Sequence, residues 1–293
     1  MRLTVLIISY KSLEKLEKCI NSIGLKKNIL VIENSDNKKI KKIIEKNYSN
    51  TKVVLNNSNL GYAKASNIGF KLIKTEYALL INTDIIITEN QINLIEEEIN
   101  KLDDDFTLAT PLSNDLIDFN KNNHLDKIFN KEINNFNSYD KISKIELVKG
   151  CSLVVNLKKF EKGKIFDDNY FFFFEEIDLC RSIKMKGEKI FLFNQIIIEH
   201  KGGQSLDDNL DTKYHNFRHW NYFWGRFYYF KKNYGYFYAF TNHIGKLIRF
   251  GINSLRYYFI SKAQFDKNKY RFLGLLNSML CKSSNLSVRI LEE

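Results

Sequence analysis

Residues 3–9 read LTVLIIS, an unbroken apolar run that is rich in valine and isoleucine. Such a run is typical of a strand buried on both faces of a parallel sheet, because neither face meets water. Ser12 follows as a candidate N-cap, and apolar residues then recur at helical spacing at Leu13, Leu16, Ile20 and Ile23. The chain is therefore expected to open with a central strand and an amphipathic helix.

The same alternation continues down the chain. Further strands are predicted at 29–32, 53–55 and 77–81, with helices around residues 40–44 and at 61–74. Thr88 and Gln91 form a capping box ahead of another helical stripe, which consists of Ile92, Ile95, Ile99 and Leu102. Strands that alternate with helices in this way specify right-handed βαβ units. The fold class is therefore predicted to be α/β, with a mostly parallel sheet covered by helices on both faces.

The remainder of the chain is less regular. Residues 113–144 are dominated by Asn, Asp and Lys, so this stretch is interpreted as an excursion outside the core that could act as a lid. Regular structure is expected to resume at 147–155, in a helix at 175–186 stopped by Gly187, and in two strands at 189–193 and 195–199. The last third combines many aromatic residues with basic ones, and helical spacing continues through it.

Composition excludes several classes of protein. The 45 Lys and Arg residues against 34 Asp and Glu leave a net charge of +11, and 44% hydrophobic residues can form a substantial core. No run reaches the roughly 18 apolar residues of a membrane-spanning helix, and residues 1–10 lack a signal-peptide pattern, so a cytoplasmic location is predicted. The cysteines have no paired spacing, so we expect no zinc site or disulfide framework, and reduced, buried thiols at Cys19, Cys151, Cys180 and Cys281.

Polar clusters follow three of the predicted strands. They are Ser9-Tyr10, Glu33-Asn34 and Asn82-Thr83-Asp84. Ligands of open α/β sheets bind at the carboxyl ends of the strands, so these clusters are expected to build one ligand site together. Asp84, with a second oxygen ligand at Asn82, could hold a hard divalent cation that also binds a diphosphate. The alternative is a helix-leading turn in which Asp84 only satisfies backbone amides.

Acidic residues after a phenylalanine run form a second candidate site. Phe171–Phe174 precede Glu175, Glu176 and Asp178 at the start of a predicted helix. The helix dipole favours carboxylates at this position, which is sufficient to explain them. Apolar surroundings and neighbouring carboxylates also raise a carboxyl pKa toward neutrality, which suits a general base. Both interpretations stay open at this point.

Two further segments could bind a ligand. His200 leaves an apolar run and is followed by glycines at 202–203, so the chain could bend closely around a metal ion or a diphosphate oxygen, although a lone histidine there is usually structural or exposed. Residues 59–69, NLGYAKASNIG, match neither a P-loop nor a GxGxxG pattern. Their small residues indicate either tight packing of a helix on a sheet, or a nucleotide lying at the helix start with Lys64 near phosphate.

In this order and spacing, these segments resemble the inverting family 2 glycosyltransferases of the GT-A fold, in particular their bacterial rhamnosyltransferase-like branch. The resemblance extends from about residue 3 to residue 205. It rests on LIISYK at 6–11, VIENS at 31–35, NLGYAKASNIG at 59–69, NTD at 82–84, FDD to EEIDL at 166–179 and HKGG at 200–203. The resemblance implies a GT-A, Rossmann-like catalytic domain over residues 1–206. A helical, basic and aromatic extension would follow at 207–293.

The resemblance also implies a role for each candidate residue. Glu176 would be the catalytic base, with Glu175 and Asp178 holding it or binding acceptor hydroxyls. Asp84, Asn82 and His200 would hold Mn²⁺ or Mg²⁺ as the cofactor. The nucleotide-sugar donor would be bound by Ser9, Tyr10, Glu33, Asn34, Gly61, Lys64, Asn67, Asn82, Thr83 and Gly150. Three positions depart from the family pattern: Glu33 and Glu176 stand where Asp is usual, and Asn82 replaces an acidic metal ligand.

The implied activity is transfer of a hexose or deoxyhexose, rhamnose by branch, from a nucleotide-diphosphate sugar to a hydroxyl of a growing surface glycan. Such glycans belong to capsule, O-antigen or lipooligosaccharide assembly. The alternative is a non-catalytic protein that binds nucleotide-sugar or nucleic acid through the same sheet edge and basic tail. A nucleotidyltransferase is disfavoured, because no glycine-rich basic loop follows the first strand.

The basic aromatic tail, which begins at residues 214–238, has three interpretations. Aromatic and basic residues together suit a nucleic-acid surface, and they equally suit a helix that lies in an anionic membrane interface. They could also form the core of a small helical subdomain, as we expect for at least half of the aromatic residues. Because family acceptors are often lipid-linked glycans on the cytoplasmic leaflet, the resemblance favours the inner face of the plasma membrane. A nucleic-acid partner is not expected.

Overall fold

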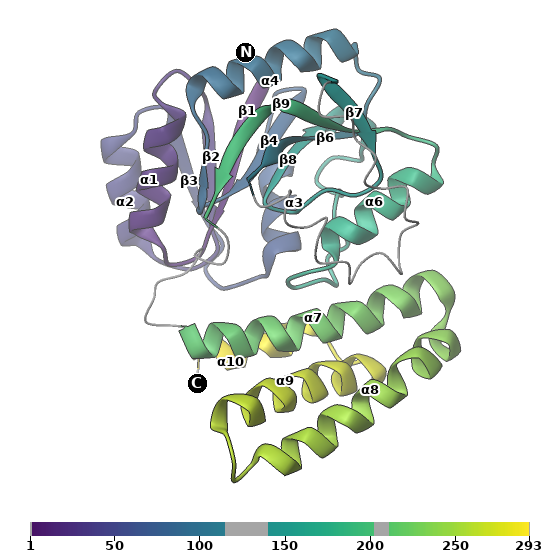
Figure 1. Ribbon diagram of the computed structural model, residues 1–293. Coiled ribbons are helices and arrows are strands. Elements are labelled where there is room, and N and C mark those ends of the chain that lie inside the picture. The colour runs from purple at the N-terminus through teal and green to yellow at the C-terminus, as the bar shows by residue number, and fades with distance from the viewer. Residues whose placement is uncertain (1, 115–139, 202–210, 293) are drawn as a thin grey trace. The chain divides into compact units, whose positions relative to one another are not determined.

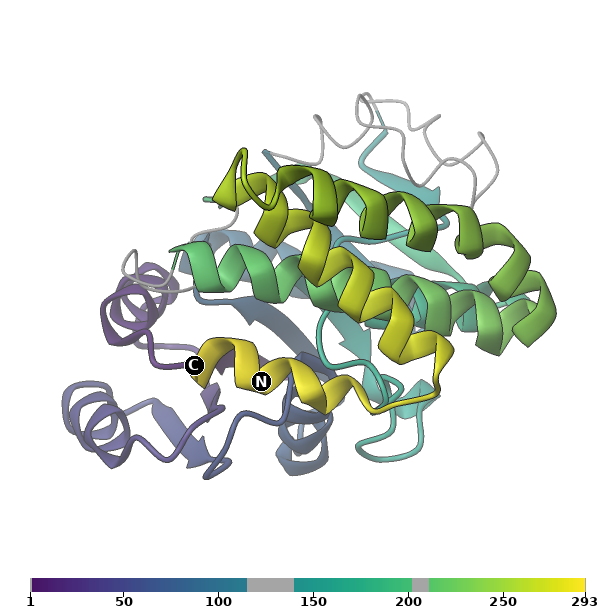
Figure 2. The ribbon, with the colours of Figure 1, turned by 90° about the horizontal axis from the view of Figure 1, so that it is seen from below.

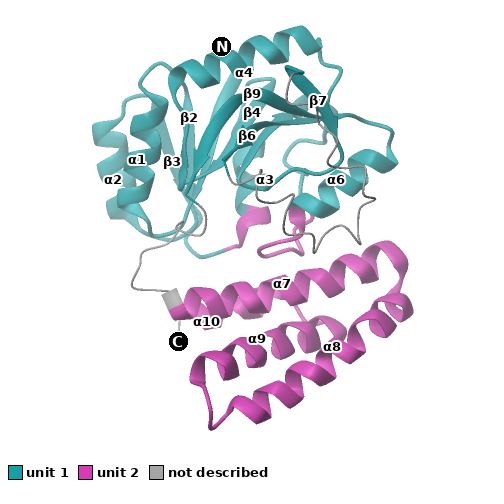
Figure 3. Cartoon of the chain, in the orientation of Figure 1, with its two compact units in different colours: residues 1–59, 65–166, 176–206 teal, residues 60–64, 167–175, 207–293 magenta. Residues whose placement is uncertain are grey.

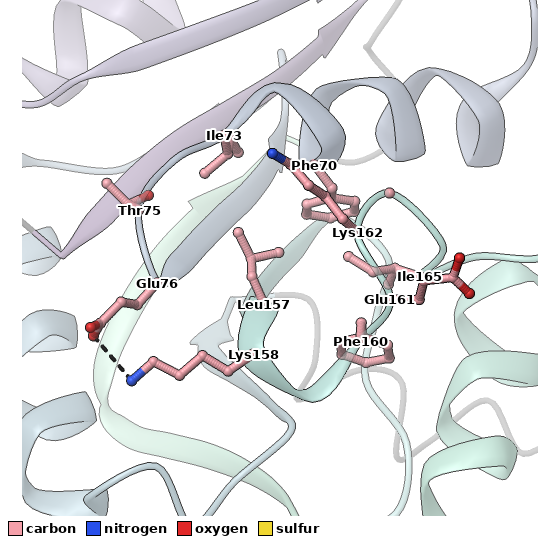
Figure 4. A pocket seen from close by; sticks show the side chains of 11 residues that line it. Phe70, Ile73, Thr75, Glu76, Leu157, Lys158, Phe160, Glu161, Lys162 and Ile165 are labelled. Atoms are coloured by element: carbon pink, nitrogen blue, oxygen red, sulfur yellow. Dashed lines mark ion pairs between the residues drawn. The ribbon is translucent and has the colours of Figure 1, made fainter.

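The computed structural model of the chain describes residues 2–114, 140–201 and 211–292. Figure 1 shows its helices and strands. The chain forms two compact units (Figure 3). Unit 1 consists of Met1–Asn59, Ala65–Phe166 and Glu176–Leu206, and unit 2 consists of Leu60–Lys64, Asp167–Glu175 and Asp207–Glu293.

Unit 1 is built on an open sheet. Among the described residues it has nine strands in the order β3-β2-β1-β4-β8-β6-β9-β5, with β7 beside β9. Its first half is parallel and consists of β1 (Leu3–Ser9), β2 (Ile29–Glu33), β3 (Thr51–Leu55) and β4 (Tyr77–Asn82). As predicted, β1 is central, because its apolar run is covered on both faces. The carboxyl ends of these four strands therefore share one edge.

Helices cover both faces of this parallel half. They are α1 (Leu13–Ile23), α2 (Lys38–Asn47), α3 (Tyr62–Leu72) and α4 (Glu89–Leu102). Residues of α1, α2 and α4 share a core with alternate residues of β1, such as Val5 and Ile7. Leu6 points to the opposite face, where Gly69 of α3 lies so close that a Cβ would overlap the leucine methyl groups. The alternation of side chains along β1 thus separates two cores.

One of the two predicted helix N-caps forms the expected hydrogen bonds. The predicted capping box at the start of α4 is confirmed, since the Thr88 side chain accepts from the Gln91 N–H and the Gln91 side chain accepts from the Thr88 N–H. Ser12 does precede α1, but its side chain forms no cap hydrogen bond. The start of α1 therefore depends on packing of its apolar stripe rather than on a capping side chain.

The second half of the sheet is mixed. It consists of β5 (Ile85–Ile86), β6 (Leu108–Ser113), β7 (Ile142–Ile145), β8 (Ser152–Asn156) and β9 (Ile190–His200). Strand β8 runs antiparallel between β4 and β6, while β6 runs parallel to β9. The helix η2 (Leu157–Lys159) follows β8, and α6 (Glu175–Met185) precedes β9. Each antiparallel pair in this half joins strands that are distant in the sequence.

Several expectations for this half are wrong. Strand β6 was not predicted, because it contains Pro111, which interrupts its pairing with β9 by a register shift between Pro111 and Leu112. Strand β7 begins within the stretch 113–144, which was assigned to a non-core excursion, and residues 115–139 of that stretch are outside the described residues. The two strands expected at 189–193 and 195–199 are one strand, β9, with the irregularity around Asn194. The proposed lid is therefore not addressed by the described structure.

Unit 2 is helical. It contains α7 (Asp211–Tyr234), α8 (Tyr236–Tyr257), α9 (Lys262–Met279), η4 (Ser284–Ser287) and α10 (Val288–Glu292). Its core cluster joins the first three helices through Phe227, Ala239, Phe250, Leu275 and Met279. Helices α7 and α9 approach closely, because Gly274 lies against the Trp220 backbone where a Cβ would not fit. Figures 1 and 2 show these helices side by side.

Burial tests the prediction for the four cysteines. Cys19, Cys151 and Cys180 are buried free thiols, as predicted, but Cys281 is exposed at the end of α9, so its expected burial is wrong. Within the described part of the chain, no helix is both long and apolar enough to cross a membrane.

Candidate functional site

The ends of β1 and β2 meet at a buried carboxylate. The strand register places Ser9 opposite Glu33, and the Ser9 hydroxyl donates to Glu33 Oε2 at 2.7 Å. The Lys11 N–H donates to Glu33 Oε1 at 3.0 Å, and the Ser35 hydroxyl donates to the same oxygen. Glu33 is 0% exposed. Its carboxylate therefore fixes the turn after β1, where Lys11 has a left-handed φ of 52°.

Asparagine amides extend this corner toward the loop after β3. The Asn34 N–H donates to the Ser9 carbonyl at 2.7 Å, and the Asn34 side-chain amide donates to Asn59 Oδ1 at 2.9 Å. Asn56 in turn donates to Asn34 Oδ1 at 3.0 Å. Half-exposed Tyr10 stands beside this network, with the Lys11 ammonium 5.3 Å from its ring centroid. The ends of β1, β2 and β3 thus form one continuous polar edge. The sequence had nominated the clusters after β1, β2 and β4, so the part played by the loop after β3 was not predicted.

Two buried oxygen atoms at or just after the end of β4 have no hydrogen-bond partner among the described residues. Oδ1 of Asn82 and Oδ1 of Asp84 are both buried and accept no hydrogen bond from any residue that the structure describes. Thr83 between them is also buried. Burial of an unpartnered carboxylate oxygen is costly, so its persistence in a fold points to a ligand or solvent that completes it.

His200 lies next to this carboxylate. Strand β5 pairs with β9 so that Ile85 is opposite His200, and His200 Nε2 is 3.5 Å from Asp84 Oδ2. The Lys201 N–H also donates to the Asp84 carbonyl at 3.1 Å. The glycines at 202–203 lie outside the described residues. The pairing of β5 with β9 therefore brings together an imidazole and a carboxylate that are far apart in the chain.

These donors fit a divalent cation. A carboxylate oxygen, an amide oxygen and an imidazole nitrogen are ligands that Mn²⁺ and Mg²⁺ accept. Within the described ranges, no cluster of three His, Cys, Asp or Glu side chains could hold a metal ion. These described residues would therefore supply only part of a coordination sphere, and oxygen atoms of an anionic ligand or of water would complete it. Cys19 is no competing ligand, because burial and the charge of Asp84 raise the pKa of its thiol.

Glu176 lies near the same edge of unit 1. The Asn82 N–H donates to the Cys151 carbonyl at 3.2 Å, which extends the pairing of β4 with β8. Gly150 precedes Cys151, and a Cβ on Gly150 would lie 3.7 Å from Cβ, Cγ and Cδ of Glu176. Glu176 is thus connected to the end of β4 through two adjacent residues. The predicted base and the predicted metal ligands belong to one region.

The backbone before the acidic residues is strained. Phe173 and Phe174 have φ values of 70° and 74°, in the left-handed region that favours glycine. Both residues, and Glu175 after them, belong to unit 2, where Glu175 is buried. Asp178 is buried in unit 1. Strained backbone of this kind concentrates at functional sites, and the sequence offered no sign of it.

The segment at 59–69 is used for packing. Gly61 has a φ of 84°, and a Cβ there would lie 2.6 Å from the Phe171 carbonyl oxygen within unit 2. The Tyr62 N–H donates to that oxygen at 2.7 Å. Lys64 is half-buried in the same unit. The close approach at Gly61 supports the tight-packing interpretation, and contact of Gly61 or Lys64 with a nucleotide stays a prediction.

Asn67 serves as an anchor within unit 1. Its Oδ1 accepts from the N–H groups of Ile165 and Phe166 at 3.2 and 3.0 Å, and its Nδ2 donates to the Phe166 carbonyl at 2.9 Å. The amide therefore holds the segment before Asp167 against α3. Asn67 thus acts by holding the backbone of residues 165–166 in place. Its proposed contact with the nucleotide-sugar donor stays a prediction.

Some residues of the polar edge were not assigned from the sequence. Ser35, Asn56 and Asn59 and the backbone N–H of Lys11 hold the corner between β1, β2 and β3 together. The available signal was the asparagine-rich loop that follows the predicted strand at 53–55. Abundant asparagine elsewhere in the chain hid that signal.

The sequence matches the family described as Glycosyl transferase family 2 over residues 4–161, which is more than half of the chain. The chain belongs to glycosyl transferase family 2. The match covers the polar edge, the end of β4 and Gly150. The acidic residues at 175–178, His200 and the helices of unit 2 follow the matched part of this glycosyltransferase.

Solved structures of two other proteins are similar to this glycosyltransferase. The mannosyltransferase PcManGT from Pyrobaculum calidifontis, in complex with GDP-Man and Mn²⁺, has a TM-score of 0.57 at 11% identity, covering 96% of this chain and 88% of that one. TarS from S. aureus, residues 1–349, has a TM-score of 0.50 at 12% identity, covering 96% and 92%. Its complex with UDP has a TM-score of 0.50 at 10% identity with the same coverage. These similarities confirm the predicted GT-A fold. A comparison with curated proteins found no match.

Proposed function

We propose that this glycosyltransferase moves a hexose or deoxyhexose, with rhamnose as one candidate, from a nucleotide-diphosphate sugar to a hydroxyl of a growing surface glycan. The anomeric configuration would be inverted. The observation that supports the proposal is the path from Asn82 through Cys151 and Gly150 to Glu176. It connects a carboxyl side chain with the end of β4, where buried oxygen atoms of Asn82 and Asp84 accept no hydrogen bond from the described residues.

The polar edge is the proposed donor site. Parallel α/β sheets bind ligands at the carboxyl ends of their strands, where Ser9, Tyr10 and Asn34 lie. Glu33 would act by holding the turn that contacts the nucleoside, because its oxygen atoms already accept hydrogen bonds from the chain. The GDP-Man complex of PcManGT and the UDP complex of TarS support a nucleotide donor for this fold.

Asp84, His200 and Asn82 are the residues that would hold a divalent cation. When bound, the cation would offset negative charge that develops on the diphosphate leaving group. Asp84 would contribute a carboxyl group, one of whose oxygen atoms is buried and accepts no hydrogen bond from the described residues. His200 contributes the nitrogen that faces Asp84 at 3.5 Å. Asn82 contributes a neutral oxygen, so Asp84 would dominate affinity.

The reaction proposed is a single in-line displacement. Glu176 takes the proton of the acceptor hydroxyl while that oxygen attacks the anomeric carbon. The bond from the anomeric carbon to the diphosphate breaks on the opposite side, and the nucleoside diphosphate leaves with the electron pair. Glu176 ends protonated, and the new glycosidic bond has inverted configuration. Glu175 and Asp178 would hold Glu176 or bind acceptor hydroxyls.

A thermal-shift panel identifies the donor. Full-length protein is heated with UDP-, GDP- and dTDP-sugars, with Mn²⁺ or Mg²⁺, since a ligand of the native state raises Tm by mass action. Asp84→Asn should remove the metal-dependent part of the shift. Absence of any nucleotide-sugar that raises Tm in the parent protein contradicts the proposed donor site.

Transfer is then measured with the donor that raises Tm. Glu176→Gln should keep the donor-induced shift and lose at least about a hundredfold in turnover, the range expected for loss of a general base. Exposed Glu97 on α4 provides a matched control, and Glu97→Gln should leave both readouts unchanged. Turnover by Glu176→Gln within a few-fold of the parent would refute the role of this residue. Donor binding without transfer or hydrolysis in the parent would favour a non-catalytic binding protein.

A further inference from the structure

The outer face of α8 is apolar although it is exposed. It consists of four side chains at helical spacing that are between 56 and 80% exposed: Phe237, Ile248, Ile252 and Leu255. In the turn between α8 and α9, Tyr258, Phe259 and Ile260 are also exposed. A surface helix normally presents polar residues on the side that faces solvent. The outer face of α8 departs from that rule at Phe237 and again from Ile248 to the end of the helix.

The opposite face of α8 already has partners within unit 2. Ala239, His243 and Phe250 are buried, and Ala239 and Phe250 belong to the core that α8 shares with α7 and α9. Figure 2 shows α8 alongside these helices. Formation of the helical core therefore does not require the outer face, so the exposed apolar side chains need another explanation. Exposed apolar patches mark contacts with proteins, ligands or membranes.

The net positive charge of residues 212–291 indicates what kind of partner would bind the outer face of α8. Residues 212–291 contain fourteen Lys and Arg residues and one acidic residue, Asp266. Removing these from the totals of 45 basic and 34 acidic residues leaves 31 and 33, so the whole positive excess lies here. Arg249 and Arg256 flank the outer face on α8. Neither forms an ion pair with a residue that the structure describes.

We propose that the outer face of α8 and the following turn bind the surface of a bilayer that contains anionic lipid. Apolar side chains would enter the boundary between headgroups and acyl chains, and Arg249, Arg256 and Lys262 would face lipid phosphates. The helix would lie on the membrane, in keeping with the lack of a spanning helix among the described residues. This goes beyond sugar transfer and does not depend on it.

Two other partners fit less well. A second copy of the chain would bring the same positive charge against α8, and like charges disfavour that contact. Single-stranded nucleic acid would need flat rings for stacking, whereas Ile248, Ile252 and Leu255 are aliphatic. An anionic bilayer satisfies both the aliphatic residues and the charge.

The test is sedimentation of the full-length protein with vesicles of phosphatidylcholine, with and without phosphatidylglycerol. Binding is expected only with phosphatidylglycerol and should weaken as salt rises. The combined substitutions Ile252→Ser, Leu255→Ser and Phe259→Ser should lower partitioning by more than about tenfold. The pair Arg249→Gln and Arg256→Gln should lower it by about fivefold per arginine.

Control variants make the test specific. Leu25→Ser and Met185→Ser remove exposed apolar side chains from unit 1, and they should leave partitioning unchanged. Fluorescence of Trp220 and Trp224 reports whether unit 2 stays folded in the α8 variants. Absence of binding to phosphatidylglycerol vesicles at low salt would overturn the proposal. So would self-association that the serine variant abolishes, or retention on polynucleotide, without vesicle binding.

Discussion

Replacement of Glu33 by glutamine tests whether a buried carboxylate organises the donor edge. In the parent, Glu33 accepts from the Ser9 hydroxyl, the Lys11 N–H and the Ser35 hydroxyl. Glutamine keeps one acceptor oxygen, so the best placement preserves the Lys11 bond and turns the amide toward Ser9. Hydrogen bonds to a charged group contribute about 1.5–3 kcal/mol each, so loss of one charged acceptor should destabilise unit 1 by about 2 kcal/mol. That corresponds to about a thirtyfold rise in the population of the open form.

The assay must measure the opening of unit 1 separately from the unfolding of unit 2. Both tryptophans, Trp220 and Trp224, belong to unit 2, so fluorescence is unsuitable. The Cys19 thiol is buried in the core that includes alternate residues of β1, so its alkylation requires local opening. When reclosing is faster than alkylation, the labelling rate follows the population of the open form. Peptide mass spectrometry separates Cys19 from exposed Cys281.

Two comparisons decide the result. Ser35→Ala removes one donor while Glu33 keeps the other two, so it should destabilise by about 1 kcal/mol. Glu33→Gln should also reduce the Tm rise caused by the nucleotide-sugar, because the turn at Lys11 loses its anchor. Labelling of Cys19 in Glu33→Gln at a rate within about twofold of the parent would refute the assigned role of this carboxylate.

Other predictions concern packing and pH. Gly69→Ala should destabilise unit 1 by about 1–3 kcal/mol in the Cys19-labelling assay, because the new methyl group overlaps Leu6; an unchanged labelling rate would contradict this packing. Burial lowers the pKa of His243 and of His219 to about 4, so the unfolded chain binds more protons below about pH 6.5. Each histidine should lower tryptophan-monitored stability by about 1 kcal/mol per pH unit toward pH 4. A flat profile would show that neither histidine is desolvated. Burial alone would raise the pKa of Asp167, but the Lys232 hydrogen bond and other contacts outweigh it and hold the pKa below its usual value. Its contribution is therefore present above about pH 4 and lost as pH falls through the depressed pKa, and Asp167→Asn should abolish that acid-side loss in urea unfolding.

Local patterns predicted the first half of the sheet well. Residues 3–9 form β1 within the predicted bounds, and the capping box at Thr88 and Gln91 begins α4 as expected. These features depend on neighbouring residues, which the sequence displays directly. The second half was less predictable, because β6 contains Pro111 and β7 has a polar composition. Pairing with β8 and β9 makes strands of these segments, and that information is not local.

The candidate site divides in the same way. The types of residue at 9–10, 33–34, 82–84, 175–178 and 200 were sufficient to nominate candidate site residues. The contact of Asp84 with His200 follows from the pairing of β5 with β9. Gly150 lies beside Glu176, and this proximity does not show in the sequence. Likewise, only the folded structure shows that the Glu33 carboxylate already accepts hydrogen bonds from three donors of the chain.

By itself, the amino-acid sequence determined the order of strands and helices, the polar residues that follow β1, β2 and β4, and the concentration of positive charge in the last third. Tertiary structure decided which of those residues meet, which carboxylate is already satisfied, and which side of α8 has no partner in the helical core. The physical reason is the separation along the sequence of the residues that interact. Periodicity, caps and charge are properties of neighbouring residues, whereas burial and contact depend on segments that the folded sheet and helices bring together.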